Sequence, residues 1–502
     1  MPWCLRRLLS WGGPSRLFGF ETLLITLAFV ALFMVALAKS NGGLFVQTEI
    51  FALLSLLYIF PRLLMYLTNP AQVVFPIDID LDGRAIDRAM VWILAGAGLM
   101  LLGFVLAEVQ FGKVCAKWKA RPQKEAPPDL TALVGVTTFV LAIEIIISFV
   151  FGVSPYVDAP DRVKEASPIW HLFAQGFRVA FSFEMALLAV VGWALSGDIK
   201  KKPALLLVST AVLVYLAITV FSGSRSGLLR VAMIAAVSAM VAHGNFRFRV
   251  SRLIIAVVLM FSVSVPGYLV ATKYRMDVWK SSVSEASDAK EIRARDMEAN
   301  VEHLKSPKVL LAIIANRLGV IDYAIIVLNR EGAKEATARY MNLSYISKNI
   351  VNLLLPGEPF PEASLNTSRV FTIVYRGDRE SSLRSRDYFS EFWTGWGVAY
   401  VLFGTVGGLA ALFFVAFFLH EGLCLIRLSS VRHKARFESC YTLVAPPMVY
   451  LSMGVDHSIV TFIFMMAQMA IFLWMLDFVS VLRRKVAGET LTGLENADSP
   501  VR

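Results

Sequence analysis

Residues 392–419 read FWTGWGVAYVLFGTVGGLAALFFVAFFL, a continuous run without a charged side chain. A helix of about 20 apolar residues crosses the roughly 30 Å hydrocarbon core of a bilayer, so this run is long enough to span a membrane. Apolar blocks of similar length recur along the 502-residue chain. The sequence therefore predicts an all-α polytopic integral membrane protein.

The overall composition agrees with this prediction. Hydrophobic residues make up 57% of the chain and charged residues only 17%, whereas a soluble protein carries about 25% charged residues. The net charge of +11 comes from short basic runs between apolar blocks rather than from one long basic face. We therefore expect a membrane environment and no nucleic-acid partner.

The apolar blocks predict roughly ten to twelve spanning helices. The predicted spans cover residues 20–38, 45–67, 89–111, 130–151, 171–195, 203–221, 227–243, 253–271, 391–419, 441–456 and 458–480.

Basic residues indicate how these helices are oriented. Short basic runs follow the third, fifth, seventh, ninth and last spans, and such runs favour the cytoplasmic side. If the spans alternate, the loops between them lie outside. Arg6, Arg7 and Arg16 favour a cytoplasmic N-terminus, whereas an odd number of alternating spans would place it outside. The orientation of the first spans stays open.

One long region, 272–390, separates the N-terminal spans from the last three, and the alternation places it outside. Within it, the apolar stretch 309–328 contains Arg317 and Asp322, which favour an amphipathic helix at the interface over another span. The prolines of 356–361, PGEPFP, break any helix there. The predicted parts are an N-terminal bundle (1–271), the outer loop (272–390), C-terminal spans (391–482) and a cytoplasmic tail (483–502).

The hairpin sequence SGSRSG at 222–227 is the sharpest local motif. Its glycines permit a tight turn with exposed backbone amides, and Arg225 adds a planar cation. Amides at a helix start together with a guanidinium suit a phosphate group. The alternative interpretation is a polar hairpin whose Arg225 reaches lipid headgroups.

A second cationic cluster precedes the ninth span. It offers bidentate partners for a diphosphate, although ion pairs with the neighbouring carboxylates are the alternative. Its members are Arg369, Arg376, Arg379, Arg384 and Arg386.

Candidate acid–base groups lie at the ends of spans. Glu391 stands at the mouth of the ninth span, and Asp456 and His457 are expected at the outer turn between the last two. Arg178 and Glu184 share the fifth span, where they could pair. The four cysteines lack metal-ligand spacing, and no nucleotide-binding motif is present, so we expect no disulfide, metal or cofactor.

Three stretches together resemble the O-antigen polymerase (Wzy-type) family. They are SGSRSG at 222–227, the loop with ANRLGVIDYAI at 315–325 and NLLLPGEPFP at 352–361, and SEFWTGWGVAYVLFGTVGGL at 390–409. The resemblance implies a GT-C-like fold in the bacterial inner membrane, with the large loop in the periplasm. It also implies the joining of undecaprenyl-pyrophosphate-linked oligosaccharide repeats into a surface polysaccharide or an exopolysaccharide, on the periplasmic face. Membrane lipids, a flippase and a chain-length regulator are the implied partners.

The resemblance also suggests roles for individual residues. Arg225 and Arg317 would neutralise the leaving diphosphate, and Glu391, with Asp322 behind it, would accept the proton of the attacking hydroxyl. Substrate binding would fall to Ser224, Arg369, Arg376, Arg379 and Arg384.

Other functions are compatible with the same sequence. O-antigen ligases share the architecture, but this chain has its loop histidine, His303, early rather than late. A transporter or flippase of lipid-linked sugars would need ionisable residues along its path and internal repeats, and no repeat is visible. A non-catalytic scaffold would leave the arginine pattern without a role.

Overall fold

A computed structural model describes much of the chain as helices and the turns that join them, with no strand among the described residues. The described residues are 24, 27–28, 30–31, 83–119, 128–146, 176–177, 180–221, 225–243, 320–329, 340–355, 359–363, 370, 374, 394–429, 431–450 and 455–486.

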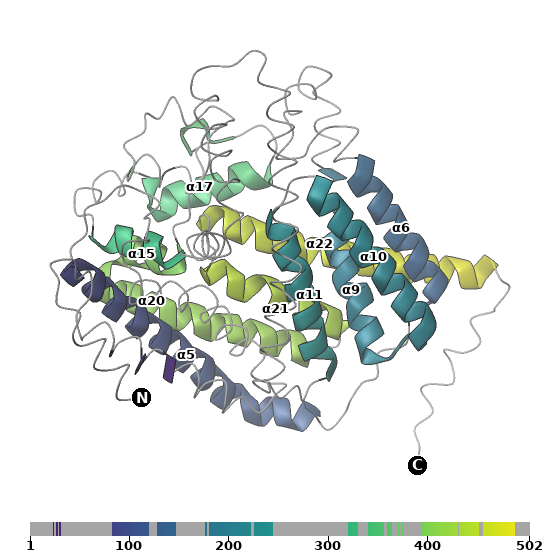
Figure 1. The fold of residues 1–502 in the computed structure, drawn as a ribbon, viewed down its shortest axis with the longest axis horizontal. Coiled ribbons are helices and arrows are strands. Elements are labelled where there is room, and N and C mark those ends of the chain that lie inside the picture. The colour runs from purple at the N-terminus through teal and green to yellow at the C-terminus, as the bar shows by residue number, and fades with distance from the viewer. Residues whose placement is uncertain are drawn as a thin grey trace, which may run out of the picture. The chain divides into compact units, whose positions relative to one another are not determined.

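Among the described residues, three helices are long and apolar enough to cross a membrane (Figure 1). These stretches are Ile86–Gln110 within α5 (Gly83–Lys119), all of α20 (Thr394–Leu428), and Ser458–Lys485 within α22 (Val455–Val486). The predicted helical class is therefore confirmed, and the protein is a membrane protein by the length and composition of these helices. The total number of spans stays a prediction.

The chain forms two compact units, and α20, α21 (Lys434–Tyr450) and α22 contribute residues to both. The first unit contains residues 1–118, 299–425 and 444–462, and the second contains 119–298, 426–443 and 463–502.

In the first unit, α5 and α20 pack closely along their length. The indole Nε1 of Trp92 donates to the carbonyl oxygen of Thr405 at 3.2 Å, and Glu108 hydrogen-bonds His420 at 2.8 Å. Between these contacts, a Cβ on Gly103 would lie only 2.5 Å from the carbonyl oxygen of Phe413. Because the contact positions advance together along both helices, α5 and α20 run parallel.

A kink divides α20 at Gly404, which has φ 71° and ψ −167°. This conformation is essentially restricted to glycine, because a Cβ would collide with the backbone. The Trp92 indole donates to the carbonyl oxygen of the next residue, Thr405, so the bend of α20 is in contact with α5. The Gly-rich sequence of this span is thus used for a bend as well as for close packing.

The second unit is built around α9 (Phe183–Ser196), whose residues from Phe183 to Trp193 are all buried. Its neighbours are α6 (Leu130–Ile145), α10 (Lys201–Phe221) and α11 (Arg225–His243), which Figure 1 shows side by side. The first residues of α21 also contact α9. There the buried Arg436 guanidinium lies 5.3 Å from the centre of the Trp193 ring.

Helix directions within each unit agree with the alternation that the basic runs require. The basic runs require the third and ninth spans to be parallel, and the corresponding helices α5 and α20 are parallel. They also require the fifth and seventh spans to be parallel. The corresponding helices α9 and α11 are parallel, because Glu184 contacts Arg230 and, further along both helices, Leu188 contacts Ser238. The compartment on each side stays a prediction.

Several predicted boundaries were wrong. The fifth span was expected from 171, but α9 begins at Phe183 because Ser182 is extended, with φ −143° and ψ 124°. The tenth was expected at 441–456, whereas α21 begins at Lys434 and ends at Tyr450. Asp456 and His457 therefore lie in the first helical turn of α22 rather than in the loop between the last two helices. Asp456 is fully buried.

Ion pairs join the helix ends that carry the basic runs in the second unit. Arg483 of α22 donates to Asp129, the N-cap of α6, at 2.6 Å. Asp477 accepts from Arg432 at 3.2 Å and lies 3.1 Å from His433. Burial pushes the pKa of Asp129 upward, but the hydrogen bonds from Arg483, Thr131 and Ala132 outweigh it and hold that pKa below its usual value.

Candidate active site

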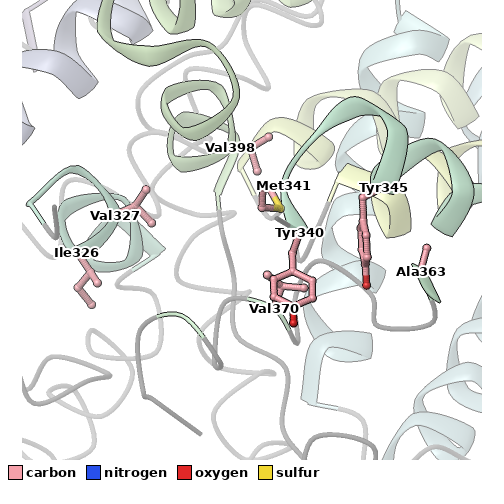
Figure 2. Close-up of a cluster of buried hydrophobic side chains, with 8 residues drawn as sticks. All are labelled: Ile326, Val327, Tyr340, Met341, Tyr345, Ala363, Val370 and Val398. Atoms are coloured by element: carbon pink, nitrogen blue, oxygen red, sulfur yellow. The ribbon is translucent and has the colours of Figure 1, made fainter. Parts of the chain in front are cut away.

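Short helices of the predicted outer loop pack onto the beginning of α20 in the first unit. These are α15 (Val320–Asn329), α17 (Leu343–Leu354) and the short 3-10 turn η5 (Pro361–Ala363). Figure 2 shows the buried side chains that they share with α20. This cluster consists of Ile326, Val327, Tyr340, Met341, Tyr345, Ala363, Val370 and Val398.

Polar side chains fix the end of α17 against η5. The Asn352 amide donates to the carbonyl of Phe360 at 2.7 Å and accepts from the Phe360 N–H at 2.8 Å. Lys348 bridges to Glu362 at 2.8 Å, and this hydrogen bond holds the pKa of Glu362 below its usual value. The helix ends at Leu354, just before the proline-rich stretch, as predicted.

The helix α15 carries Asp322, the second candidate for the catalytic base after Glu391. The sequence predicted an amphipathic helix at the interface over 309–328. The described part of it, α15, is instead largely buried, because it packs into the loop's own core. Asp322 itself is only 1% exposed. Its catalytic role stays a prediction, and Arg317 lies outside the described residues.

The first residue of α20, Thr394, is held in an unusual conformation. It is fully buried with φ 62°, a left-handed backbone that is rare for a β-branched residue. Its hydroxyl accepts from the Gly397 N–H at 3.1 Å and so caps the helix. A Cβ on Gly397 would lie 3.4 Å from Val327 of α15, so this turn is in close contact with the loop layer. Backbone strain of this kind concentrates at functional sites.

The SGSRSG motif ends at the start of α11, in the second unit. Arg225 is the first residue of that helix, and Ser224 lies outside the described residues. Further along α11, Arg230 donates from Nη1 to Oε2 of Glu184 at 2.8 Å. The sequence suggested that Glu184 could pair with Arg178, and the described partner of Glu184 is Arg230, from another helix. Arg178 lies outside the described residues.

A buried polar pair, Glu108 and His420, was missed by sequence reasoning. His420 is fully buried, Glu108 is 9% exposed, and the Phe104 ring lies 6.2 Å from the imidazole. A polar residue that ends a long apolar run, as His420 does after Leu419, is the signal that could have found it.

Most of the predicted site residues lie outside the described part of the chain. The structure describes Asp322 in the first unit and the backbone of Arg225 in the second. The residues outside the described part of the chain are Ser224, Arg317, Arg369, Arg376, Arg379, Arg384 and Glu391.

The chain was also compared with known proteins. No family model, curated protein or solved structure matches it. The functional assignment therefore depends on the residues and their arrangement.

Proposed function

We propose that this protein polymerises oligosaccharide repeat units carried on a polyprenyl diphosphate, at the outer face of a bacterial inner membrane. The observation that carries the proposal is the packed layer of α15, α17 and η5 on the first turns of α20. A folded layer at a helix mouth provides a surface on which sugar chains can lie beside the membrane. The strained, buried Thr394 stands three residues after Glu391 at this mouth.

The proposed reaction is a glycosyl transfer between two lipid-linked substrates. A sugar hydroxyl of the acceptor attacks the anomeric carbon of the donor, and a new C–O bond forms. The bond from that carbon to the diphosphate breaks, and its electron pair leaves with the polyprenyl diphosphate. The hydroxyl proton passes to a carboxylate, for which Glu391 is the first candidate and Asp322 the second.

Cationic side chains would stabilise the departing diphosphate. Arg225 is the first candidate, at the start of α11. Arg317, Arg376 and Arg379 are the further candidates. Holding both lipid-linked substrates at one membrane surface would supply much of the rate through orientation.

The test is a reconstitution of the purified protein in liposomes with lipid-linked repeat units. The wild type is expected to produce a ladder of longer glycans and to release polyprenyl diphosphate. The Arg225→Ala variant should lose at least 100-fold in rate, by analogy with about 2.7–4 kcal/mol per lost stabilising group. The control is Arg432→Ala, which removes an exposed arginine that pairs with Asp477. This variant should leave the rate unchanged. Absence of any ladder with the wild type rules the proposal out.

One observation favours a second function, a proton-coupled carrier of lipid-linked sugars. Glu108 and His420 form a buried pair between two membrane-length helices, and ionisable groups in such places often mark proton or ion pathways. A carrier predicts that substrate crosses vesicles only under a pH gradient and that Glu108→Gln abolishes this. Glycan chain growth in the same vesicles without a gradient favours the polymerase.

A further inference from the structure

The face of α17 that the protein covers is its more polar one. Asn349 donates to the carbonyl of Ala363, and Asn352 exchanges two hydrogen bonds with the backbone of Phe360. Tyr345, one turn before Asn349 on the same side of the helix, joins the buried cluster shown in Figure 2. These contacts fix α17 to η5 and to the core of the loop layer through its polar side.

The opposite face of α17 is apolar and open. Leu343, Ile350 and Leu354 stand at positions i, i+7 and i+11, so they form one stripe along the helix. Leu343 is 65% exposed, Leu354 is 36% exposed and Ile350 is half-buried. An amphipathic helix of a soluble domain turns such a stripe towards the core. In α17 the stripe is instead left uncovered.

The exposed apolar side chains of α5 and α20 indicate where lipid surrounds the first unit. On α5 the exposed large apolar residues run from Val91 to Val109, about 27 Å at about 1.5 Å per residue. On α20 they run from Phe403 to Leu425, about 33 Å. Both lengths match a hydrocarbon core of about 30 Å. The hydrocarbon boundary therefore lies near Val91 and Phe403, at the end where both parallel helices begin.

The attachment of α17 to α20 is close to this boundary. The Trp92 indole donates to the carbonyl of Thr405 and lies edge-on to Tyr400, with ring centroids 5.7 Å apart. Tryptophan and tyrosine are enriched where a membrane meets water. The cluster that contains Tyr345 of α17 includes Val398 of α20, with Tyr400 packed against it. The contact with α20 thus lies one to two helical turns from the boundary at Phe403.

We propose that the open stripe of α17, formed by Leu343, Ile350 and Leu354, contacts bilayer lipid beside the start of α20. Lipid is the occupant because the stripe is apolar and adjoins the lipid-facing surfaces of α5 and α20. The sequence predicted an interfacial amphipathic helix at 309–328, and this inference assigns that role to α17. It goes beyond the proposed function, since it requires no glycan substrate.

A lipid contact at α17 would also hold the rest of the loop layer at the membrane. The buried cluster joins α17 to Val327 of α15 and to Ala363 of η5. A restraint on α17 therefore acts on all three elements, and the layer needs no separate anchor at α15.

Fluorescence quenching tests the contact in the full-length protein, made cysteine-free and reconstituted in liposomes. Leu343→Cys places an environment-sensitive fluorophore on the stripe. Ser344→Cys is the matched control, because Ser344 is also exposed but lies about 100° around the helix. Spin-labelled phospholipid should quench the probe at Leu343→Cys several-fold more strongly than at Ser344→Cys, and aqueous iodide should show the opposite order. Equal quenching by iodide at the two positions overturns the proposal.

A second pair of positions tests the other end of the stripe. Leu354→Cys should show the same order against Glu362→Cys on η5, which removes only a surface ion pair with Lys348. If the probes at Leu343 and Leu354 are shielded from both iodide and spin-labelled lipid, a protein surface covers the stripe and the proposal is wrong.

This measurement needs no turnover, so its result is separate from that of the polymerase assay. If the quenching order is as expected but the wild type forms no polymer, the polymerase proposal fails and the lipid contact stands. If polymer forms while iodide reaches the stripe freely, only the lipid contact fails.

Discussion

The imidazole Nε2 of His420 lies 2.8 Å from Oε2 of Glu108, and this contact joins the C-terminal halves of α5 and α20. Both side chains are buried, and the close approach at Gly103 brings the two backbones together just before them. Burial of polar groups in an apolar environment costs free energy unless the groups are hydrogen-bonded. The pair is therefore a specific hydrogen-bonded contact between two parallel membrane-length helices.

Removing one member of this pair should destabilise the protein. Glu108→Ala leaves the His420 nitrogen buried without its partner, at a cost of about 1–3 kcal/mol. Glu108→Gln keeps an acceptor of similar size and should cost less. Melting temperatures in detergent compare the two variants. Equal melting temperatures for Glu108→Ala and the wild type would contradict the buried contact.

The kink of α20 should depend on glycine at position 404. Gly404→Ala places a Cβ in a conformation that only glycine adopts readily, with φ 71°, at a cost of about 1–3 kcal/mol. Gly135→Ala on α6 is the control, since a Cβ there meets nothing within 4 Å. The expected result is a lower melting temperature for Gly404→Ala alone. An unchanged value would mean that this helix tolerates an ordinary residue at its bend.

The N-cap of α6 should contribute stability that depends on pH. Because the pKa of Asp129 is held below its usual value in the folded protein, its carboxylate stabilises the fold above the usual carboxyl pKa of about 4. That contribution is lost as the pH falls through the lowered folded value. Asp129→Asn keeps the cap but loses the charge, so the wild type should be more stable than this variant at pH 7.

The same measurement at lower pH provides the control. The stability difference between wild type and Asp129→Asn should shrink as the carboxylate is protonated. Asp129→Ala loses the bonds to Thr131 and Ala132 as well, so it should cost about 1 kcal/mol more at every pH. A difference between wild type and Asp129→Asn that stays constant down to about pH 2 would show that the Arg483 bridge has no influence on that pKa.

Apolar length predicted the position of several helices well. The predicted span at 130–151 begins at the residue where α6 begins, Leu130, and the predicted span at 203–221 begins two residues after the start of α10 at Lys201. The end of α17 before PGEPFP follows from the properties of proline. Helix type and approximate position are thus readable, because they depend on neighbouring residues and on apolar length.

The features that the sequence did not predict depend on distant residues. The ion pair of Glu184 with Arg230 joins residues that are 46 positions apart in the sequence and lie on two different helices. The burial of Asp322 follows from packing of the loop segments against α20. The left-handed Thr394 has no local signal at all, because threonine disfavours that conformation, and only the surrounding structure can impose it.

A polymerase of the proposed kind needs the SGSRSG turn and the arginine-rich loop on the same side of the membrane. Single cysteines introduced at Ser226 and Ser381, in a cysteine-free background, can be tested with a membrane-impermeant thiol reagent. We expect both to be labelled from the outside of intact cells. If Ser226→Cys is labelled only after the inner face is opened, Arg225 cannot share a site with the loop, and the proposed mechanism is wrong.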